Sequence, residues 1–166
     1  IPYVVSLRGS DVPGFNNRLK LDYVLLKGTF RRIWRGADAI VANSRGLAQL
    51  AQRFYPALRY DVICNGIDTE TFYPAAERRF SGRLKLLTVC RLIERKRIDL
   101  LIEALAELVR NGTDAELTIV GHGNLEAELK VLARALNLTD RVCFRGLVEY
   151  EHLASIYREH HIFLMS

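Results

Sequence analysis

The sequence predicts an α/β fold with two parallel-sheet domains. Short apolar runs of strand length alternate along the chain with longer segments whose apolar residues recur at helical spacing. This alternation is typical of βα units, in which helices connect neighbouring parallel strands. An aperiodic stretch that holds Pro74 and Gly82 separates two such regions. We therefore expect one domain over residues 1–65, a linker over 66–83 and a second domain over 84–166.

In the first region, strands are expected at residues 3–7, 39–42 and 60–64, and helices at 18–35 and 45–54. Asn43 or Ser44 should cap the second helix, because a side-chain oxygen there can accept from free backbone N–H groups. Asn65-Gly66 should form a turn after the last strand. The first helix should pack one apolar face on the sheet. That face comprises Leu19, Tyr23, Leu26, Phe30, Ile33 and Trp34.

In the second region, strands are expected at residues 84–90, 117–120, 142–144 and 161–166, and helices at 98–110, 125–136 and 150–158. Arg91 and Lys96 lie in the loop after the first of these strands, and Gly121-His122-Gly123 follows the second. Parallel strands end at one edge of a sheet, so both loops should lie at the rim where open α/β sheets bind ligands. Two cations beside a helix N-terminus suit phosphate oxygens.

Composition excludes several classes of protein. The sequence contains no apolar run of 18 residues or more, so no transmembrane helix is expected. Cys64, Cys90 and Cys143 are widely spaced, which predicts buried reduced thiols in a reducing, cytoplasmic compartment rather than a disulfide or zinc framework. The four histidines show no metal-ligand spacing. The start of the chain does not resemble a signal peptide, and we expect it to begin within a longer protein.

Several groups of residues, in the same order and at the same spacing, match one known family. They are Ala37-Asp38; Ala42-Asn43-Ser44; Asn65-Gly66-Ile67-Asp68 with Phe72 and Pro74; Arg91-Leu92 with Lys96; Val120-Gly121 with Gly123; and Val142, Phe144, Gly146 and Val148 with Leu153 and Tyr157. On the basis of these residues, the chain resembles the retaining nucleotide-sugar glycosyltransferases of group 1, also called family four. Cys90 and Arg97 stand where that family has glycines. The resemblance covers nearly the whole chain and implies the GT-B fold, with two Rossmann-like domains.

The resemblance also implies a function, namely transfer of a sugar from a nucleotide-diphosphate-sugar donor to an acceptor with retention of configuration. The implied donor-binding residues are Arg91, Lys96, Gly121, Phe144, Leu147 and Val148, with Arg91 and Lys96 also stabilising the leaving group. Arg8 and Asp11 are expected on the acceptor side. The nucleotide sugar is a substrate, so no cofactor or metal is expected. The family's glutamate pair would follow Ser166, so both domains are expected to be incomplete and this chain alone is expected to have no transferase activity.

Other interpretations remain open at this stage. The chain also fits another GT-B enzyme such as a nucleotide-sugar epimerase, or a nucleotide-binding fragment without turnover. Arg91 and Lys96 can be read as solvated charges, Gly121-His122-Gly123 as a plain turn, Asp11 as a turn cap and Arg8 as a surface cation. A dinucleotide-binding oxidoreductase is disfavoured, because Glu126 stands where the glycine fingerprint needs its third glycine.

Positive charge is concentrated in the first half of the chain. Residues 1–83 hold 13 Lys and Arg against 7 Asp and Glu, whereas residues 84–166 hold 11 against 12. The helix expected at 18–35 carries six of these cations and one acid, Asp22. One interpretation is a packed helix with solvated cations. The other is that this basic surface contacts an anionic membrane at its cytoplasmic face, or binds an acidic acceptor. The expected acceptor is a glycan, a lipid or a small molecule, and no nucleic-acid partner is expected.

Overall fold

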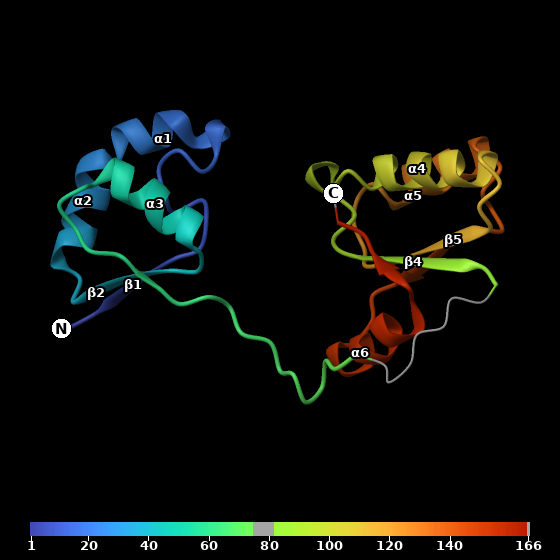
Figure 1. The fold of residues 1–166 in the computed structure, drawn as a ribbon. Helices are drawn as coiled ribbons and strands as arrows, with labels where there is room; N and C mark the ends of the chain where they lie inside the picture. The colour runs from blue at the N-terminus through green and yellow to red at the C-terminus, as the bar shows by residue number, and fades with distance from the viewer. Residues whose placement is uncertain (75–81, 166) are drawn as a thin grey trace. The chain divides into compact units, whose positions relative to one another are not determined.

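The computed structural model describes residues 1–74 and 82–165 (Figure 1). The chain divides into two compact units, Ile1–Ile67 and Asp68–Ser166. Residues 68–74 of the predicted linker therefore group with the second unit, where the Phe72 ring packs edge-on against Tyr150 and Tyr157. Residues 75–81 of that linker lie outside the described residues.

The first unit is a parallel sheet with its helices on one face. The strands, in the order β1-β2-β3, are β1 (Val4–Leu7), β2 (Ala39–Ala42) and β3 (Asp61–Val62). The helices are the short 3-10 helix η1 (Asn17–Leu19), α1 (Lys20–Leu25), α2 (Lys27–Gly36) and α3 (Arg45–Phe54), and Figure 1 shows α1 to α3 on one side of the sheet. Ser44 caps α3 as expected, because its hydroxyl accepts from the Leu47 N–H at 3.2 Å. Buried Trp34 packs edge-on against Phe54 and Tyr60 in the core.

The helix predicted at 18–35 is divided at Leu26, whose backbone leaves the helical region. The two parts are held by different anchors. The Tyr23 hydroxyl donates to the Ser10 carbonyl at 2.8 Å and ties α1 to the loop after β1, while Trp34 ties α2 to the sheet. Tyr23 and Trp34 are buried as predicted, but Leu26 and Ile33 are exposed, so part of the predicted apolar face was wrong.

The second unit is a four-stranded parallel sheet with helices on both faces. The strand order is β6-β5-β4-β7, with β4 (Leu84–Val89), β5 (Ala115–Val120), β6 (Val142–Gly146) and β7 (Ile162–Phe163). Helices α4 (Ile98–Arg110) and α5 (Glu126–Ala135) cover one face, and α6 (Tyr150–Glu159) lies on the other (Figure 1). β3 and β7 are shorter than predicted, and Asn65-Gly66 is not assigned as a turn.

Alternate residues of the strands explain why this sheet is apolar on both faces. Leu86, Leu117 and Ile119 belong to the large cluster under α4 and α5. Leu87 and Val120 point the other way, into a smaller cluster with α6. Successive strand side chains alternate between faces, so a sheet covered on both sides needs a continuous apolar run. These runs are what the sequence displays at β4 and β5.

The cysteines are free, as predicted, but they are not fully buried. Cys64 and Cys143 are exposed, so the prediction of buried thiols was wrong for these two, and Cys90 is only partly buried. Cys143 lies on β6, which has a strand neighbour on one side only among the described strands. Apolar neighbours in sequence therefore do not guarantee burial at the edge of a sheet. Within residues 1–74 and 82–165, no helix is long and apolar enough to cross a membrane.

Candidate functional site

The candidate site is the rim at which β4 and β5 end together. Val89 is paired with Val120, so the loops that follow both strands leave the sheet at the same edge. The first loop carries Arg91 and then the short 3-10 helix η2 (Glu94–Lys96), which leads into α4. The carboxyl ends of parallel strands are the usual ligand edge of an open α/β sheet.

Arg91 and Lys96 are positioned differently on this rim. The Arg91 side chain is exposed, and in the part of the chain that the structure describes its guanidinium makes no hydrogen bond or ion pair. Lys96 is half-buried at the end of η2, where its N–H donates to the Ile93 carbonyl at 2.9 Å. Arg91 therefore offers an accessible cationic fork at the rim, of the kind that binds carboxylate or phosphate oxygens.

Arg97, the next cation of the loop, is already neutralised by its own helix. Its guanidinium donates to the Asp99 carboxylate from Nε at 3.0 Å and from Nη2 at 2.7 Å. This hydrogen bond is the largest cause that lowers the pKa of Asp99, and it raises the pKa of Arg97. Arg97 also has left-handed backbone angles, φ 41° and ψ 46°, which explains why glycine suits this position. Apart from the two-residue spacing, nothing in the sequence indicates this ion pair.

A second charged group lies where β5 leads into α5. The Glu126 carboxylate binds Lys130 Nζ at 2.6 Å and His122 Nδ1 at 3.2 Å. The Lys130 bond first, and the His122 bond second, lower the pKa of Glu126. Lys130 also lies over the Phe144 ring, 5.4 Å from its centroid. These contacts favour the ionised form of Glu126, and Lys130 beside it offsets its negative charge.

The third rim loop follows β6. The Gly121 N–H donates to the Gly146 carbonyl at 2.7 Å, so the β5 and β6 loops are joined. Of the residues predicted to bind the donor, Leu147 is 80% exposed, whereas Val148 packs in the α6 cluster. Phe144 packs against the α4 and α5 cluster. The Phe144 side chain is thus part of the core, and in this segment the Leu147 side chain is the exposed one.

Arg8 and Asp11 lie at the corresponding rim of the first sheet, just after β1. The Asp11 carboxylate accepts from the Arg8 N–H at 2.8 Å and from the Gly9 N–H at 2.6 Å. Asp11 therefore holds the turn, which leaves the Arg8 side chain exposed. Arg8 lies in the first unit and Arg91 in the second.

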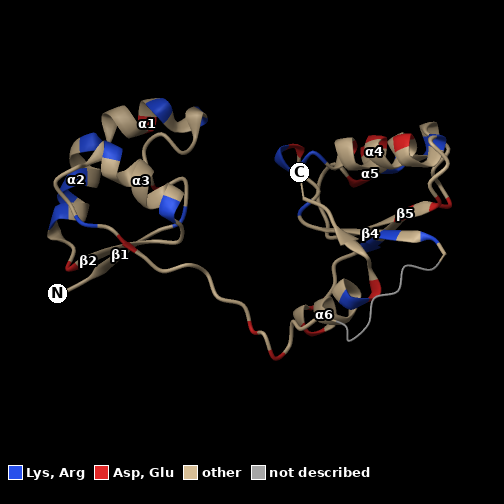
Figure 2. Ribbon diagram, viewed as in Figure 1, with Lys and Arg blue, Asp and Glu red and all other residues tan. Residues whose placement is uncertain are grey.

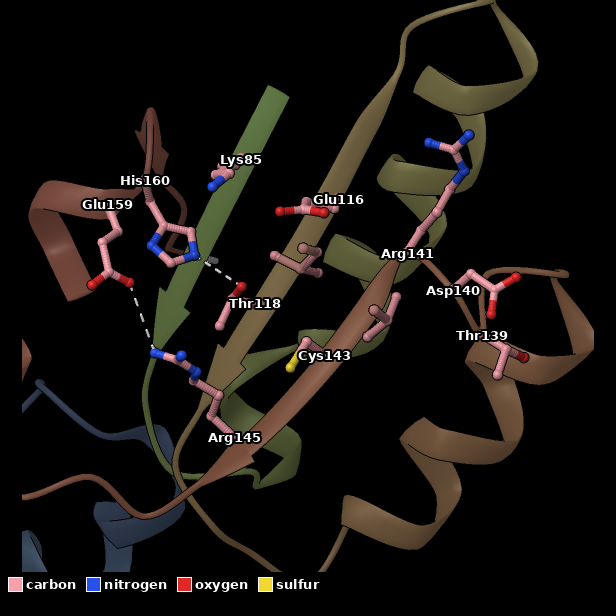
Figure 3. Close-up of a pocket in the computed structure, with 12 residues that line it drawn as sticks. Lys85, Glu116, Thr118, Thr139, Asp140, Arg141, Cys143, Arg145, Glu159 and His160 are labelled. Atoms are coloured by element: carbon pink, nitrogen blue, oxygen red, sulfur yellow. Dashed lines mark hydrogen bonds and ion pairs between the residues drawn. The ribbon is translucent and has the colours of Figure 1, made fainter. Parts of the chain in front are cut away.

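A hollow in the second unit lies at the opposite end of its sheet (Figure 3). It measures about 430 Å³ and is lined by the amino ends of the strands and by the end of α6. His160, buried beside it, bonds Thr118 Oγ1 through Nε2 at 2.8 Å and the Ile156 carbonyl through Nδ1 at 2.7 Å. Ligands of open α/β sheets bind at the carboxyl ends, so this hollow is not the expected donor site.

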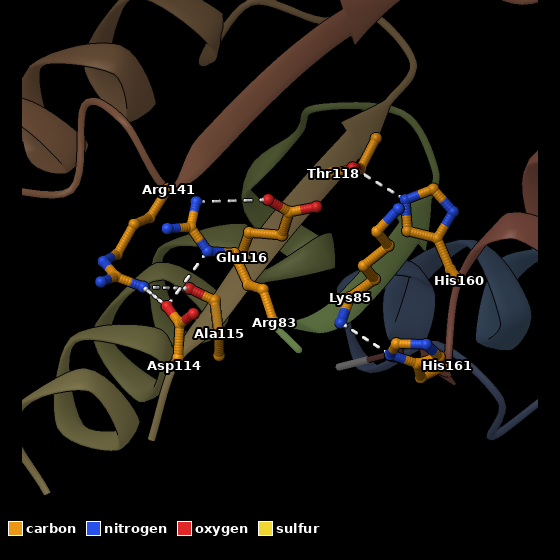
Figure 4. Close-up of polar contacts among 9 residues, drawn as sticks. All are labelled: Arg83, Lys85, Asp114, Ala115, Glu116, Thr118, Arg141, His160 and His161. Atoms are coloured by element: carbon orange, nitrogen blue, oxygen red, sulfur yellow. Dashed lines mark hydrogen bonds and ion pairs between the residues drawn. The ribbon is translucent and has the colours of Figure 1, made fainter. Parts of the chain in front are cut away.

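The charged residues at that amino end bind one another (Figure 4). Asp114 accepts from Arg141 at 2.6 Å and from Arg83 at 3.0 Å. The Arg141 hydrogen bond is the largest cause of the lowered pKa of Asp114. These contacts connect the starts of three strands. No group of three His, Cys, Asp or Glu side chains that could hold a metal is found among residues 1–74 and 82–165.

Comparison with known proteins identifies the family. The family model "Glycosyl transferases group 1" matches residues 69–166, and the model "Glycosyltransferase Family 4" matches residues 1–71. The chain therefore belongs to the group 1 glycosyltransferases. The two matches meet within a few residues of the boundary at Ile67, so each compact unit corresponds to one of the two family models.

Two curated relatives illustrate the match. The GDP-mannose-dependent alpha-(1-6)-phosphatidylinositol monomannoside mannosyltransferase of Mycobacterium tuberculosis is 32% identical over 148 residues, 84% of this chain and 38% of that protein. The N-acetylgalactosamine-N,N'-diacetylbacillosaminyl-diphospho-undecaprenol 4-alpha-N-acetylgalactosaminyltransferase of Campylobacter jejuni is 37% identical over 113 residues, 66% of this chain and 30% of that protein. The chain thus spans well under half of these relatives.

Solved structures show the same fold at low sequence identity. A mutant of Staphylococcus aureus TarM, solved with UDP and other ligands, superposes with a TM-score of 0.76 and 14% identity over 99% of this chain and 32% of its own. Anabaena HepE, solved with UDP and glucose, gives 0.72 and 19% over 99% of this chain and 46% of its own. The GT-B architecture predicted from the sequence is therefore confirmed.

Proposed function

We propose that this chain supplies the donor site of a glycosyltransferase, which moves a sugar from a nucleoside-diphosphate sugar to an acceptor with retention of configuration. The observation that carries the proposal is the exposed Arg91 guanidinium, which has no partner among the described residues and shares a loop with Lys96 at the carboxyl rim of the second sheet. The N-terminus of α4 follows the same loop and adds a partial positive charge. Together these groups suit the oxygens of a diphosphate.

The proposed chemistry rests on charge stabilisation at the leaving group. The nucleoside diphosphate gains negative charge as the bond to the sugar breaks. Cations held in place before the reaction lower the barrier, and single groups of this kind are typically worth ~10²–10³-fold in rate. Arg91 and Lys96 would act in this way, without a protein nucleophile, a metal or a cofactor. Arg97 is already paired with the Asp99 carboxylate, so we do not include it among the cations that bind the diphosphate.

Relatives support the ligand class. The Mycobacterium tuberculosis relative is named as GDP-mannose-dependent, and Anabaena HepE was solved with UDP and glucose. Both names contain a nucleoside diphosphate, which matches the cationic rim. Membership of the group 1 glycosyltransferases favours sugar transfer over the epimerase considered from the sequence. Turnover assays with UDP- and GDP-sugars separate a transferase from a nucleotide-binding fragment without activity.

Titration calorimetry with UDP and with GDP tests the donor site. Arg91→Ala and Lys96→Ala should each weaken binding about tenfold to a hundredfold, because hydrogen bonds to charged groups are worth ~1.5–3 kcal/mol. Arg95→Ala is the matched control, because Arg95 is an exposed cation of the same loop. It should change affinity much less. If Arg91→Ala and Lys96→Ala bind both nucleotides as tightly as Arg95→Ala does, the proposed donor site is wrong.

We also propose that the first unit makes peripheral contact with an anionic membrane. Leu21, Val24 and Leu25 are 78%, 72% and 80% exposed on α1, and their spacing places them on one helical face. Exposed lysines begin both helices of this region, Lys20 in α1 and Lys27 in α2, and Figure 2 shows Lys and Arg on α1, α2 and α3. An exposed apolar face bordered by cations is the pattern of a helix that lies in a membrane interface.

The expected free energy of membrane binding and the names of two relatives both support this membrane contact. Burying a side chain of this size is worth roughly 1.5–3 kcal/mol, and each cation near an anionic leaflet adds ~1 kcal/mol. The printed names of the two relatives include phosphatidylinositol monomannoside and diphospho-undecaprenol. A lipid-linked acceptor at the cytoplasmic face of the membrane is therefore proposed ahead of a free glycan or small molecule.

Co-sedimentation with vesicles of phosphatidylglycerol or of phosphatidylcholine alone tests the contact. Binding should require the anionic lipid, weaken with salt, and fall in Leu21→Ser/Leu25→Ser and in Lys20→Glu/Lys27→Glu. Val131→Ser, at an exposed valine on α5 of the second unit, is the control and should bind normally. Arg31 is unsuitable for mutation, because it stacks on Phe54 and Tyr55. Equal binding to both vesicles, or to neither, contradicts the proposal.

A further inference from the structure

Two glycines of the β5–α5 loop lie where no side chain fits. A Cβ at Gly121 would meet the carbonyl oxygen of Cys90, and a Cβ at Gly123 would meet that of Leu92, both well under the 3.0 Å that real Cβ atoms keep. In both cases the obstacle is backbone, which cannot rotate away as a side chain can. These glycines therefore mark the place where the loop that carries Arg91 crosses the loop after β5.

Hydrogen bonds fix the same crossing. The Leu92 N–H donates to the His122 carbonyl at 3.0 Å, and the Leu92 carbonyl accepts from the Leu125 N–H at 3.2 Å. The Leu92 side chain is fully buried in the cluster under α4 and α5. Leu92 is thus held in place by its N–H, its carbonyl and its side chain, and we call these three contacts the clamp. Arg91 is the preceding residue, so the clamp also fixes the position of its backbone.

We propose that Gly121 and Gly123 are positioning residues for the donor diphosphate. Because they lack a Cβ, the loop that carries Arg91 can pack directly against the β5–α5 loop. This packing fixes the positions of the cations Arg91 and Lys96. This inference rests on the proposed donor site, but it assigns the glycines a role different from close approach to the nucleotide. A methyl group at Gly123 would push the loop away by on the order of 1 Å, and misplacement of that size is enough to cost up to ~10²-fold where groups must be aligned.

Gly123 gives the cleaner test of the two. Its backbone angles lie outside the left-handed region, so Gly123→Ala adds volume without backbone strain. Gly121 has φ +129°, so a substitution there is strained in any case. Gly112→Ala is the control, because Gly112 also belongs to the second unit and has φ +85°. Apart from Gly112 and its two chain neighbours, no described residue has an atom within 4 Å of the added Cβ. That variant loses stability without crowding the loop.

A double-mutant cycle separates positioning from direct contact. With UDP or GDP as the probe, Gly123→Ala should weaken binding by roughly tenfold or more, as expected for a displaced charged hydrogen bond, and Gly112→Ala by much less. In the Arg91→Ala background the same Gly123→Ala change should have a clearly smaller effect, because one of the two cations that it displaces is already gone. An equal loss in both backgrounds would show that Gly123 approaches the nucleotide itself, and would overturn the proposal.

Hydrogen exchange tests the clamp without any nucleotide. In the unmodified chain the Leu92 amide should be protected to the degree of amides in β4 and β5. In Gly123→Ala, protection at Leu92 should fall while the strands keep theirs; in Gly112→Ala it should stay. Unchanged protection in Gly123→Ala, or fast exchange of Leu92 in the unmodified chain, contradicts the clamp. If the unmodified chain binds neither UDP nor GDP while these exchange results hold, the donor site fails and the clamp stands.

Discussion

At the scale of single residues, Arg97 has a backbone conformation that an arginine adopts only at a cost in free energy. Left-handed backbone angles cost an L-residue roughly 1–2 kcal/mol, which glycine avoids. Arg97 pairs with Asp99, but its side chain is half exposed, and exposed pairs of this kind contribute little. The ion pair therefore offsets only part of the strain. Its main effect is to neutralise Arg97, a cation that the proposed donor site does not use.

Arg97→Gly should stabilise the second unit by about 0.5–1 kcal/mol, since relief of strain exceeds the added freedom of the unfolded chain. Arg95→Gly, within η2 on the same loop, should instead destabilise it. Hydrogen exchange of the α4 amides measures this unit alone, whereas fluorescence of Trp34, the single tryptophan, reports on the first unit. Equal destabilisation by the two substitutions would show that Arg97 is not strained.

At the scale of elements, Asp114 joins the starts of three neighbouring strands. Arg83 precedes β4, Asp114 precedes β5 and Arg141 precedes β6, and both arginines bind the same carboxylate. The strand ends that these contacts connect lie opposite the candidate site. The charges of this edge thus join the starts of the strands, whereas the proposed donor site lies at the other edge.

The pKa of Asp114 is lowered in the folded chain, chiefly by the Arg141 hydrogen bond, so its contribution to stability has a definite pH dependence. The contribution is complete above the unfolded pKa, about 3.9, and is lost as the pH falls through the lower folded pKa. The stability difference between the unmodified chain and Asp114→Asn should therefore shrink between about pH 5 and pH 2. Arg141→Gln should remove part of this dependence. A difference that stays constant with pH would contradict the assignment.

At the scale of the whole molecule, the order of strands and helices can be predicted from the sequence. The spacing of apolar residues, and the turn and capping residues between segments, indicate the same boundaries along most of the chain. The rim is predictable for the same reason, since loops after parallel strands must share an edge. The division at Leu26 was not predictable, because α1 carries apolar residues on two faces and only the Tyr23 contact with Ser10 selects one. The crossing of Gly123 with Leu92 depends on the register of β4 against β5, which no local pattern encodes.

The exposure of two thiols has a practical consequence. Cys64 lies in the first unit and Cys143 in the second, and both are open to solvent. Each unit thus carries a natural attachment point for a fluorescent or spin label. With the partly buried Cys90 replaced by alanine, a donor–acceptor label pair would report the distance between the two units directly. Adding nucleotide to such a labelled chain would show whether occupancy of one unit draws the other toward it.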